Sequence, residues 1–152
     1  MPDLVWIPAG SAAGPIPPPV VSLVAAELGE LAALIGLRDD EGGIRRGAVV
    51  EVLSRRWHGA GVVPAPDLHA DGVHPQERLA VRVEAGRAWT NNDGLLAVLE
   101  TAVDPDLSSL LLVVPVTYKG SACFTPVVQQ LRRLLSGRGV SLDLTGVGVL
   151  GY

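Results

Sequence analysis

The pattern of hydrophobic and polar residues predicts helices alternating with strands after an extended N-terminal stretch. Residues 4–19 are uncharged and rich in proline and glycine, so we expect an extended arm there. Residues 20–37 carry apolar side chains at helical spacing and predict a helix, which the charged and Gly-ended segment 38–43 terminates. A second helix is predicted over residues 44–57 by the same spacing.

The middle of the chain predicts an irregular segment followed by a strand. Residues 62–76 contain three prolines and indicate an irregular strand and loop. Residues 79–84 alternate strictly, which is typical of a strand. One face takes Leu79, Val81 and Val83, and the other takes Ala80, Arg82 and Glu84.

The remaining pattern predicts the fold class. A helix over residues 92–103 precedes an apolar strand over 110–116, and a helix over 124–136 precedes a strand over 140–144. Strands separated by helices predict an α/β fold with some parallel pairing, in which helices flank a mixed central sheet. We therefore expect an N-terminal arm over 1–19 and a single α/β domain over 20–152.

Composition restricts the possible partners and environments. Hydrophobic residues make up 48% of the chain and charged residues 18%, with 12 basic against 16 acidic residues and a net charge of −4. The sequence has no basic tail of the kind that indicates a nucleic-acid binder. The single cysteine, Cys123, excludes an intramolecular disulfide and indicates a reducing compartment. Prolines interrupt the uncharged N-terminal stretch, so we expect a cytoplasmic protein without a membrane partner.

Three carboxylates are candidates for metal chemistry. Glu84 ends a predicted core strand and meets a loop, a geometry that suits oxygen ligation of a divalent cation. Asp71 lies across the Gly72–Gln76 turn, and a hairpin there brings its carboxylate toward Glu84. Glu51 borders the apolar face of the second helix. We expect Asp71 and Glu84 to bind Mg²⁺, or alternatively Mn²⁺, with Glu51 assisting through water or a second ion.

This order of acidic positions resembles the core of the PD-(D/E)XK nuclease superfamily, which includes many restriction endonucleases. The stretch Val81-Arg-Val-Glu-Ala-Gly-Arg87 is similar to the strand and loop of its BglII/BamHI-like branch, and the likeness extends over about residues 44–145. The resemblance implies a restriction-endonuclease-like fold and a Mg²⁺-dependent DNA phosphodiesterase, in which Arg82, Arg87 or Lys119 stabilises the phosphate.

The same sequence departs from that motif at two positions. Arg82 replaces the first of two alternating acids, and Gly86 stands where the family has a lysine. These departures favour a second interpretation, a catalytically inactive subunit of the same fold that acts as a structural or interaction module. Its partner would be another protein or a second copy of the chain.

Each candidate also has a structural interpretation. Arg82 and Glu84 share a strand face and are expected to form an ion pair. Glu51 precedes Arg55 by four residues, the favourable order for a helix salt bridge. Lys119 is expected to be a solvated turn residue.

A separate cluster in the loop allows a third interpretation. Asp67, His69, Asp71 and His74 combine imidazole with carboxylate, which suits zinc, manganese or non-haem iron in a small hydrolase. Aspartates in such loops also commonly bond their own backbone, the structural alternative for Asp67 and Asp71.

Overall fold

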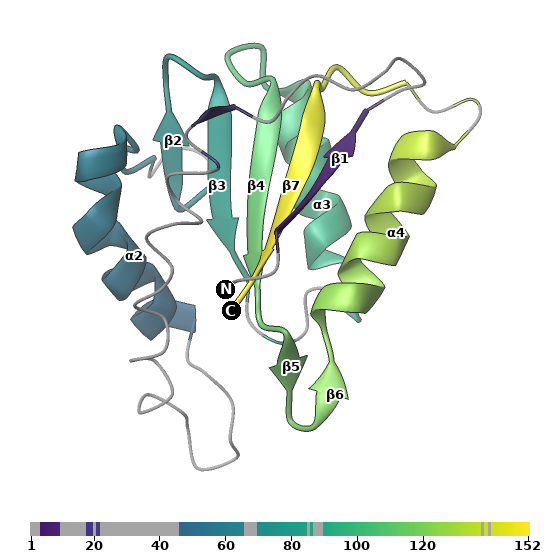
Figure 1. The fold of residues 1–152 in the computed structure, drawn as a ribbon. Helices are drawn as coiled ribbons and strands as arrows, with labels where there is room; N and C mark the ends of the chain where they lie inside the picture. Colours follow the sequence, from purple (N-terminus) through teal and green to yellow (C-terminus); the bar gives the residue numbers. More distant parts are fainter. Residues whose placement is uncertain are drawn as a thin grey trace.

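The chain folds around a mixed five-stranded sheet with helices on both faces (Figure 1). The computed structural model describes residues 4–9, 18, 19, 21, 46–65, 70–84, 86, 90–137, 139 and 141–152, apart from the side chains of Arg56 and His58. The helices are α2 (Arg46–Ala60), α3 (Asp93–Val103) and α4 (Phe124–Ser136). The strands of the sheet are β1 (Leu4–Pro8), β2 (Gly72–His74), β3 (Leu79–Val83), β4 (Ser109–Val114) and β7 (Gly146–Gly151), and β5 (Thr117–Tyr118) and β6 (Ser121–Ala122) form a separate hairpin.

The sheet has the strand order β1-β7-β4-β3-β2. Its three central strands β3, β4 and β7 are mutually parallel, and the edge strands β1 and β2 are antiparallel to their neighbours. A helix connects each successive pair of parallel strands, since α3 follows β3 and α4 follows β4. The predicted α/β class with a mixed sheet is confirmed.

Two hydrophobic cores lie on opposite faces of the sheet, and β3 contributes to both. Val81 packs with Leu53 and Trp57 of α2, whereas Ala80 packs on the face that α3 and α4 cover. The predicted alternation of β3 is therefore confirmed. β4 is buried along its whole length, as its uninterrupted apolar run predicted.

The C-terminal strand lies later in the chain than its prediction. The sequence predicted it over residues 140–144, but β7 runs over Gly146–Gly151. Glycines hid the strand because they lower strand propensity. Here they make room for neighbouring side chains: a Cβ at Gly146 would lie 2.5 Å from Cζ2 of Trp6, and a Cβ at Gly148 would lie 2.9 Å from Cδ1 of Leu111.

The N-terminal stretch contributes a strand to the sheet. Leu4–Pro8 is extended, as predicted, and it pairs with β7 as the edge strand β1. Ile7 is buried, and Trp6 packs on the α2 face of the sheet. The predicted helix over 20–37 lies outside the described residues, except for Val21, which is buried in the core beside α2.

None of the helices in the described residues is long and apolar enough to cross a lipid bilayer.

Candidate functional site: the carboxyl end of β3

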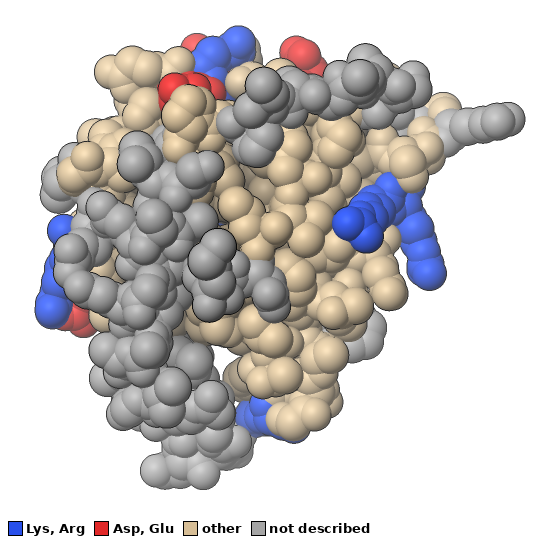
Figure 2. Space-filling model, viewed as in Figure 1, with Lys and Arg blue, Asp and Glu red and all other residues tan. Residues whose placement is uncertain are grey.

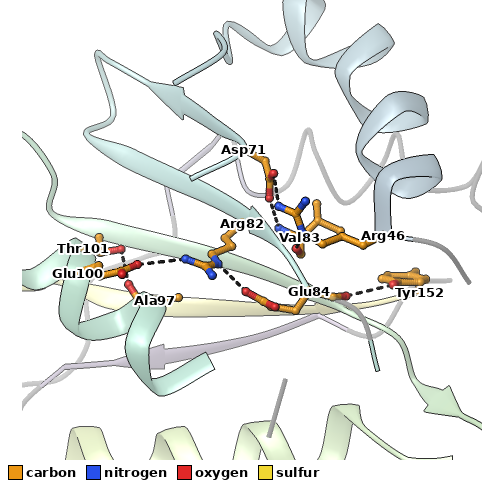
Figure 3. A network of polar contacts seen from close by, with 9 residues as sticks. All are labelled: Arg46, Asp71, Arg82, Val83, Glu84, Ala97, Glu100, Thr101 and Tyr152. Carbon is orange, nitrogen blue, oxygen red and sulfur yellow. Dashed lines mark hydrogen bonds and ion pairs between the residues drawn. The ribbon is translucent and has the colours of Figure 1, made fainter. Parts of the chain in front are cut away.

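Asp71 and Glu84 lie near the same end of the β2–β3 hairpin, where β3 finishes (Figure 3). The turn after β2 reverses the chain, and the Asp71 N–H donates to the Val81 carbonyl at 2.9 Å. The carboxyl ends of parallel strands are the usual place for ligand sites in open α/β sheets. The predicted hairpin thus brings the two acidic residues to one end of the sheet.

Asp71 closes this end of the hairpin through its carboxylate. Its Oδ2 accepts a hydrogen bond from the Val83 N–H at 2.7 Å, and its Oδ1 pairs with the guanidinium of Arg46. The Nε of Arg46 also donates to the Val83 carbonyl at 2.7 Å. Arg46 and Asp71 together satisfy the backbone of Val83 and join α2 to the end of β3.

Glu84 belongs to a second network, which reaches α3 on the other side of the sheet (Figure 3). Arg82 donates from Nε to Oε1 of Glu84 at 2.5 Å and pairs through Nη1 with Oε2 of Glu100 at 3.0 Å. One guanidinium therefore serves two carboxylates. The expected Arg82–Glu84 ion pair is confirmed.

Glu84 is more buried than Asp71 and Glu51, with 8% of its side chain exposed against 10% and 65%. Burial raises the pKa of Glu84 above its ordinary value, because the interior disfavours the charged form. Arg82 acts against this shift by attraction and by hydrogen bonding, while Asp93 adds to it. The Tyr152 hydroxyl donates to the Glu84 carbonyl at 3.1 Å, and burial is the main cause that raises the pKa of this phenol.

Glu51 lies apart from these networks, on the exposed side of α2. Its carboxylate pairs with Arg55 at 2.5 Å, and both side chains are more than half exposed. The expected helix salt bridge is confirmed. Among the described residues, which include Glu51, Asp71 and Glu84, no three acidic, histidine or cysteine side chains form a group that could hold a metal ion.

Two further candidates, Lys119 and His74, lie at turns of the chain. Lys119 lies in the β5–β6 turn with a positive φ of 49°, and its Nζ is 5.4 Å from the centroid of the Tyr118 ring. His74 accepts a hydrogen bond at Nδ1 from the Glu77 N–H at 3.1 Å, within the hairpin turn. Asp67, His69 and Arg87 lie outside the described residues.

Gly86 and Cys123 form a packed contact beside this end of the sheet. A Cβ at Gly86 would lie 1.8 Å from Cγ of Tyr118, so the ring occupies the space that any other residue would need. The Cys123 thiol donates a hydrogen bond to the Gly86 carbonyl at 3.1 Å, and burial raises the pKa of the thiol. A buried cysteine of this kind is a structural residue and a poor nucleophile.

Sequence reasoning missed Arg46 and Glu100, which complete the two networks. Neither stands near Asp71 or Glu84 in the chain, and only the arrangement of helices around β3 brings them there. A signal for Glu100 exists, since it is the one charged residue inside the apolar helix after β3. Arg46 carries no comparable signal because it begins a helix with other arginines along it.

On the face seen in Figure 2, the Lys and Arg side chains of the described residues form no extended basic region. There, Lys and Arg side chains form separate groups near the margin, and uncharged atoms fill most of the centre among the described residues. A protein that relies on phosphate contacts needs such a region.

No protein-family model matches the chain, and no curated protein or solved structure is significantly similar to it. The chemistry of the described residues is therefore the evidence for function.

Proposed function

We propose that this chain is a non-catalytic module that acts by binding another protein. The observation that carries the proposal is that arginines of the same chain bind both carboxylates at the end of β3. Arg46 holds Asp71, and Arg82 holds Glu84.

This pairing does not fit a divalent cation. Mg²⁺ binds through carboxylate oxygens that are free to accept it. Oε1 of Glu84 and both oxygens of Asp71 already accept short charge-assisted or backbone hydrogen bonds. A cation would have to displace Arg82 from Glu84, and the guanidinium, still paired with Glu100, would then lie close to a positive ion and repel it.

The outer surface of α3 supports the binding role. Leu96, Leu99 and Val103 are 49%, 46% and 81% exposed, and their spacing places them on one side of the helix. A helix that is apolar on all sides is normally covered on all sides. Exposed apolar patches on a protein surface are typical of sites that bind another protein.

The test is the size of the assembly that contains the chain in its native host. We expect size-exclusion chromatography of the lysate to place the wild-type protein well above the mass of one chain. The triple substitution Leu96→Ser, Leu99→Ser and Val103→Ser should release it as a single chain. A matched α4 variant, Gln129→Ser, should remain in the assembly. Elution of the wild-type protein as a single chain would overturn the proposal.

A second candidate function is Mg²⁺-dependent hydrolysis of DNA phosphodiesters. It is favoured by the placement of Asp71 and Glu84 at one end of β3, and it requires Arg82 to release Glu84. Plasmid cleavage with Mg²⁺, Mn²⁺ or EDTA tests it, with Glu84→Ala as the critical variant. Glu51→Ala is the matched control, because Glu51 is an exposed acid paired with an arginine elsewhere. Metal-dependent cutting that is lost in Glu84→Ala alone would establish this function in place of the first.

A further inference from the structure

α3 presents apolar side chains on both sides. Gly94, Ala97, Val98 and Thr101 face the core, and the stripe of Leu96, Leu99 and Val103 faces outward. Its only polar residues are Asp93, Glu100 and Thr101. The stripe is therefore a contiguous apolar surface that the described part of the chain leaves exposed.

A groove runs beside the C-terminal half of the same helix. It begins as a pocket of about 370 Å³ between α3 and β3, which is hollow because small side chains line it. These are Ala70, Ala80 and Ala97. The larger apolar side chains of the lining include Leu107 and Leu110, and Arg82 and Glu100 are among its charged members. A second pocket of about 480 Å³ shares Asp104 and Leu107 with the first and extends the groove toward β2. Val103 lies at the groove and in the stripe, so the two form one surface.

The charge around this surface is acidic. Asp93, Glu100, Asp104 and Asp106 fall on α3 and just after it, and the chain has no Lys or Arg between Arg87 and Lys119. Two arginines approach from the sheet. Arg82 is shared between Glu84 and Glu100, and Arg78 donates to the carbonyls of Pro105 and Asp106. With the carboxylates of Asp93, Asp104 and Asp106 included, the net charge around this surface is negative.

We propose that this surface, the α3 stripe with its adjoining groove, binds a cationic amphipathic helix of a partner protein. Apolar side chains of that helix pack on Leu96, Leu99 and Val103, one enters the groove, and flanking Lys or Arg side chains face Asp104 and Asp106. The inference rests on the proposed function and names the chemistry of the partner. A second copy of this chain is a poorer occupant, because it would set the acidic segment 93–106 against its own like charges.

The probe is a fluorescently labelled synthetic peptide of Leu and Lys patterned as an amphipathic helix, and its counterpart carries Glu in place of Lys. Fluorescence anisotropy should show binding of the Lys peptide to the wild-type protein and none of the Glu peptide. The triple Ser substitution of the stripe should weaken binding at least about tenfold. Asp104→Asn with Asp106→Asn should weaken it about threefold and flatten its dependence on salt.

Controls separate this inference from the proposed function. Gln129→Ser on α4 should bind the Lys peptide as the wild-type protein does, and circular dichroism should show each variant folded. Equal binding of the two peptides, or full binding to the triple variant, would overturn the inference. A stripe-dependent assembly in the lysate without binding of the Lys peptide would keep the proposed function and overturn the cationic partner. A dimer in sedimentation that the triple variant abolishes would assign the surface to a second copy.

Discussion

Helices α3 and α4 cover the same face of the sheet, yet their outer surfaces differ. The exposed residues of α4 are polar, namely Thr125, Gln129, Arg132, Arg133 and Ser136. The outward side of α3 carries Leu96, Leu99 and Val103. α4 thus has the amphipathic pattern of a helix that faces water, and α3 has the pattern of a helix between two packed surfaces. This difference is the basis on which we propose α3 as the side that binds a partner.

The two helices are also attached to the sheet in different ways. α4 buries Val127, Leu131 and Leu135 in the core. α3 contributes the smaller Ala97 and Val98, and Glu100 adds an ion pair with Arg82 of β3. We infer that packing dominates the attachment of α4, whereas α3 depends in part on the charged network at the end of β3.

The largest expected effect comes from the core side of α4. Leu131→Ala removes a fully buried side chain and should lower the free energy of unfolding by about 3 kcal/mol. Leu99→Ala on the outside of α3 is the matched control and should change it by less than about 0.5 kcal/mol. Chemical denaturation measures both, and equal losses would remove the distinction between the two surfaces.

The next effect concerns the attachment of α3. Arg82→Met leaves Glu84 and Glu100 without their shared partner. It should lower the free energy of unfolding by about 2 to 3 kcal/mol at neutral pH. Arg55→Met breaks an exposed pair and should cost less than about 1 kcal/mol. Hydrogen exchange of Arg82→Met should accelerate in α3 more than in α4. Uniform acceleration would show that the network does not hold α3 in particular.

A smaller effect is expected on the opposite side of β3. Asp71→Asn removes the charge that Arg46 binds but keeps an oxygen for the Val83 N–H, so it should cost about 1 kcal/mol. Hydrogen exchange should then rise near the start of α2 and stay unchanged in α3. An increase in α3 would mean that the two networks act as one.

The smallest effect is a change in the pH dependence of stability. The pKa of Glu84 is raised in the folded protein, so the native state holds this proton more tightly than the unfolded chain. Its contribution to stability is complete below the ordinary value of 4.5 and is lost as the pH rises through the raised pKa. Glu84→Gln should remove this fall. Denaturation from pH 4 to 7 should show wild-type stability declining relative to the variant, and a relative increase would contradict the raised pKa.

Much of the fold could be predicted because periodicity reports burial. The alternation in β3, the apolar run of β4 and the bounds of α4 follow directly from the pattern of side chains. β7 was misplaced because its glycines are required by Trp6 and Leu111, residues distant in the chain. The pairing of β1 with β7 depends on the same contacts and has no local signal.

The candidate site was predictable only where its partners are close in sequence. Arg82 with Glu84, and Glu51 with Arg55, are two and four residues apart, and both pairs were expected. The pairing of Asp71 with Arg46, and of Arg82 with Glu100, depends on how α2 and α3 lie beside β3. The apolar residues of the outward stripe of α3 can be seen in the sequence. The sequence alone does not distinguish them from the residues on the buried side, because both sides of the helix are apolar.

The central claim is tested most directly by photo-cross-linking in the native host from one position on each helix. A photoreactive amino acid replaces Leu99 of α3 in one strain and Gln129 of α4 in another, both exposed positions. We expect one discrete cross-linked protein from position 99, joined through a segment rich in apolar and basic residues, and none from position 129. No product from position 99, or the same product from both helices, would contradict it.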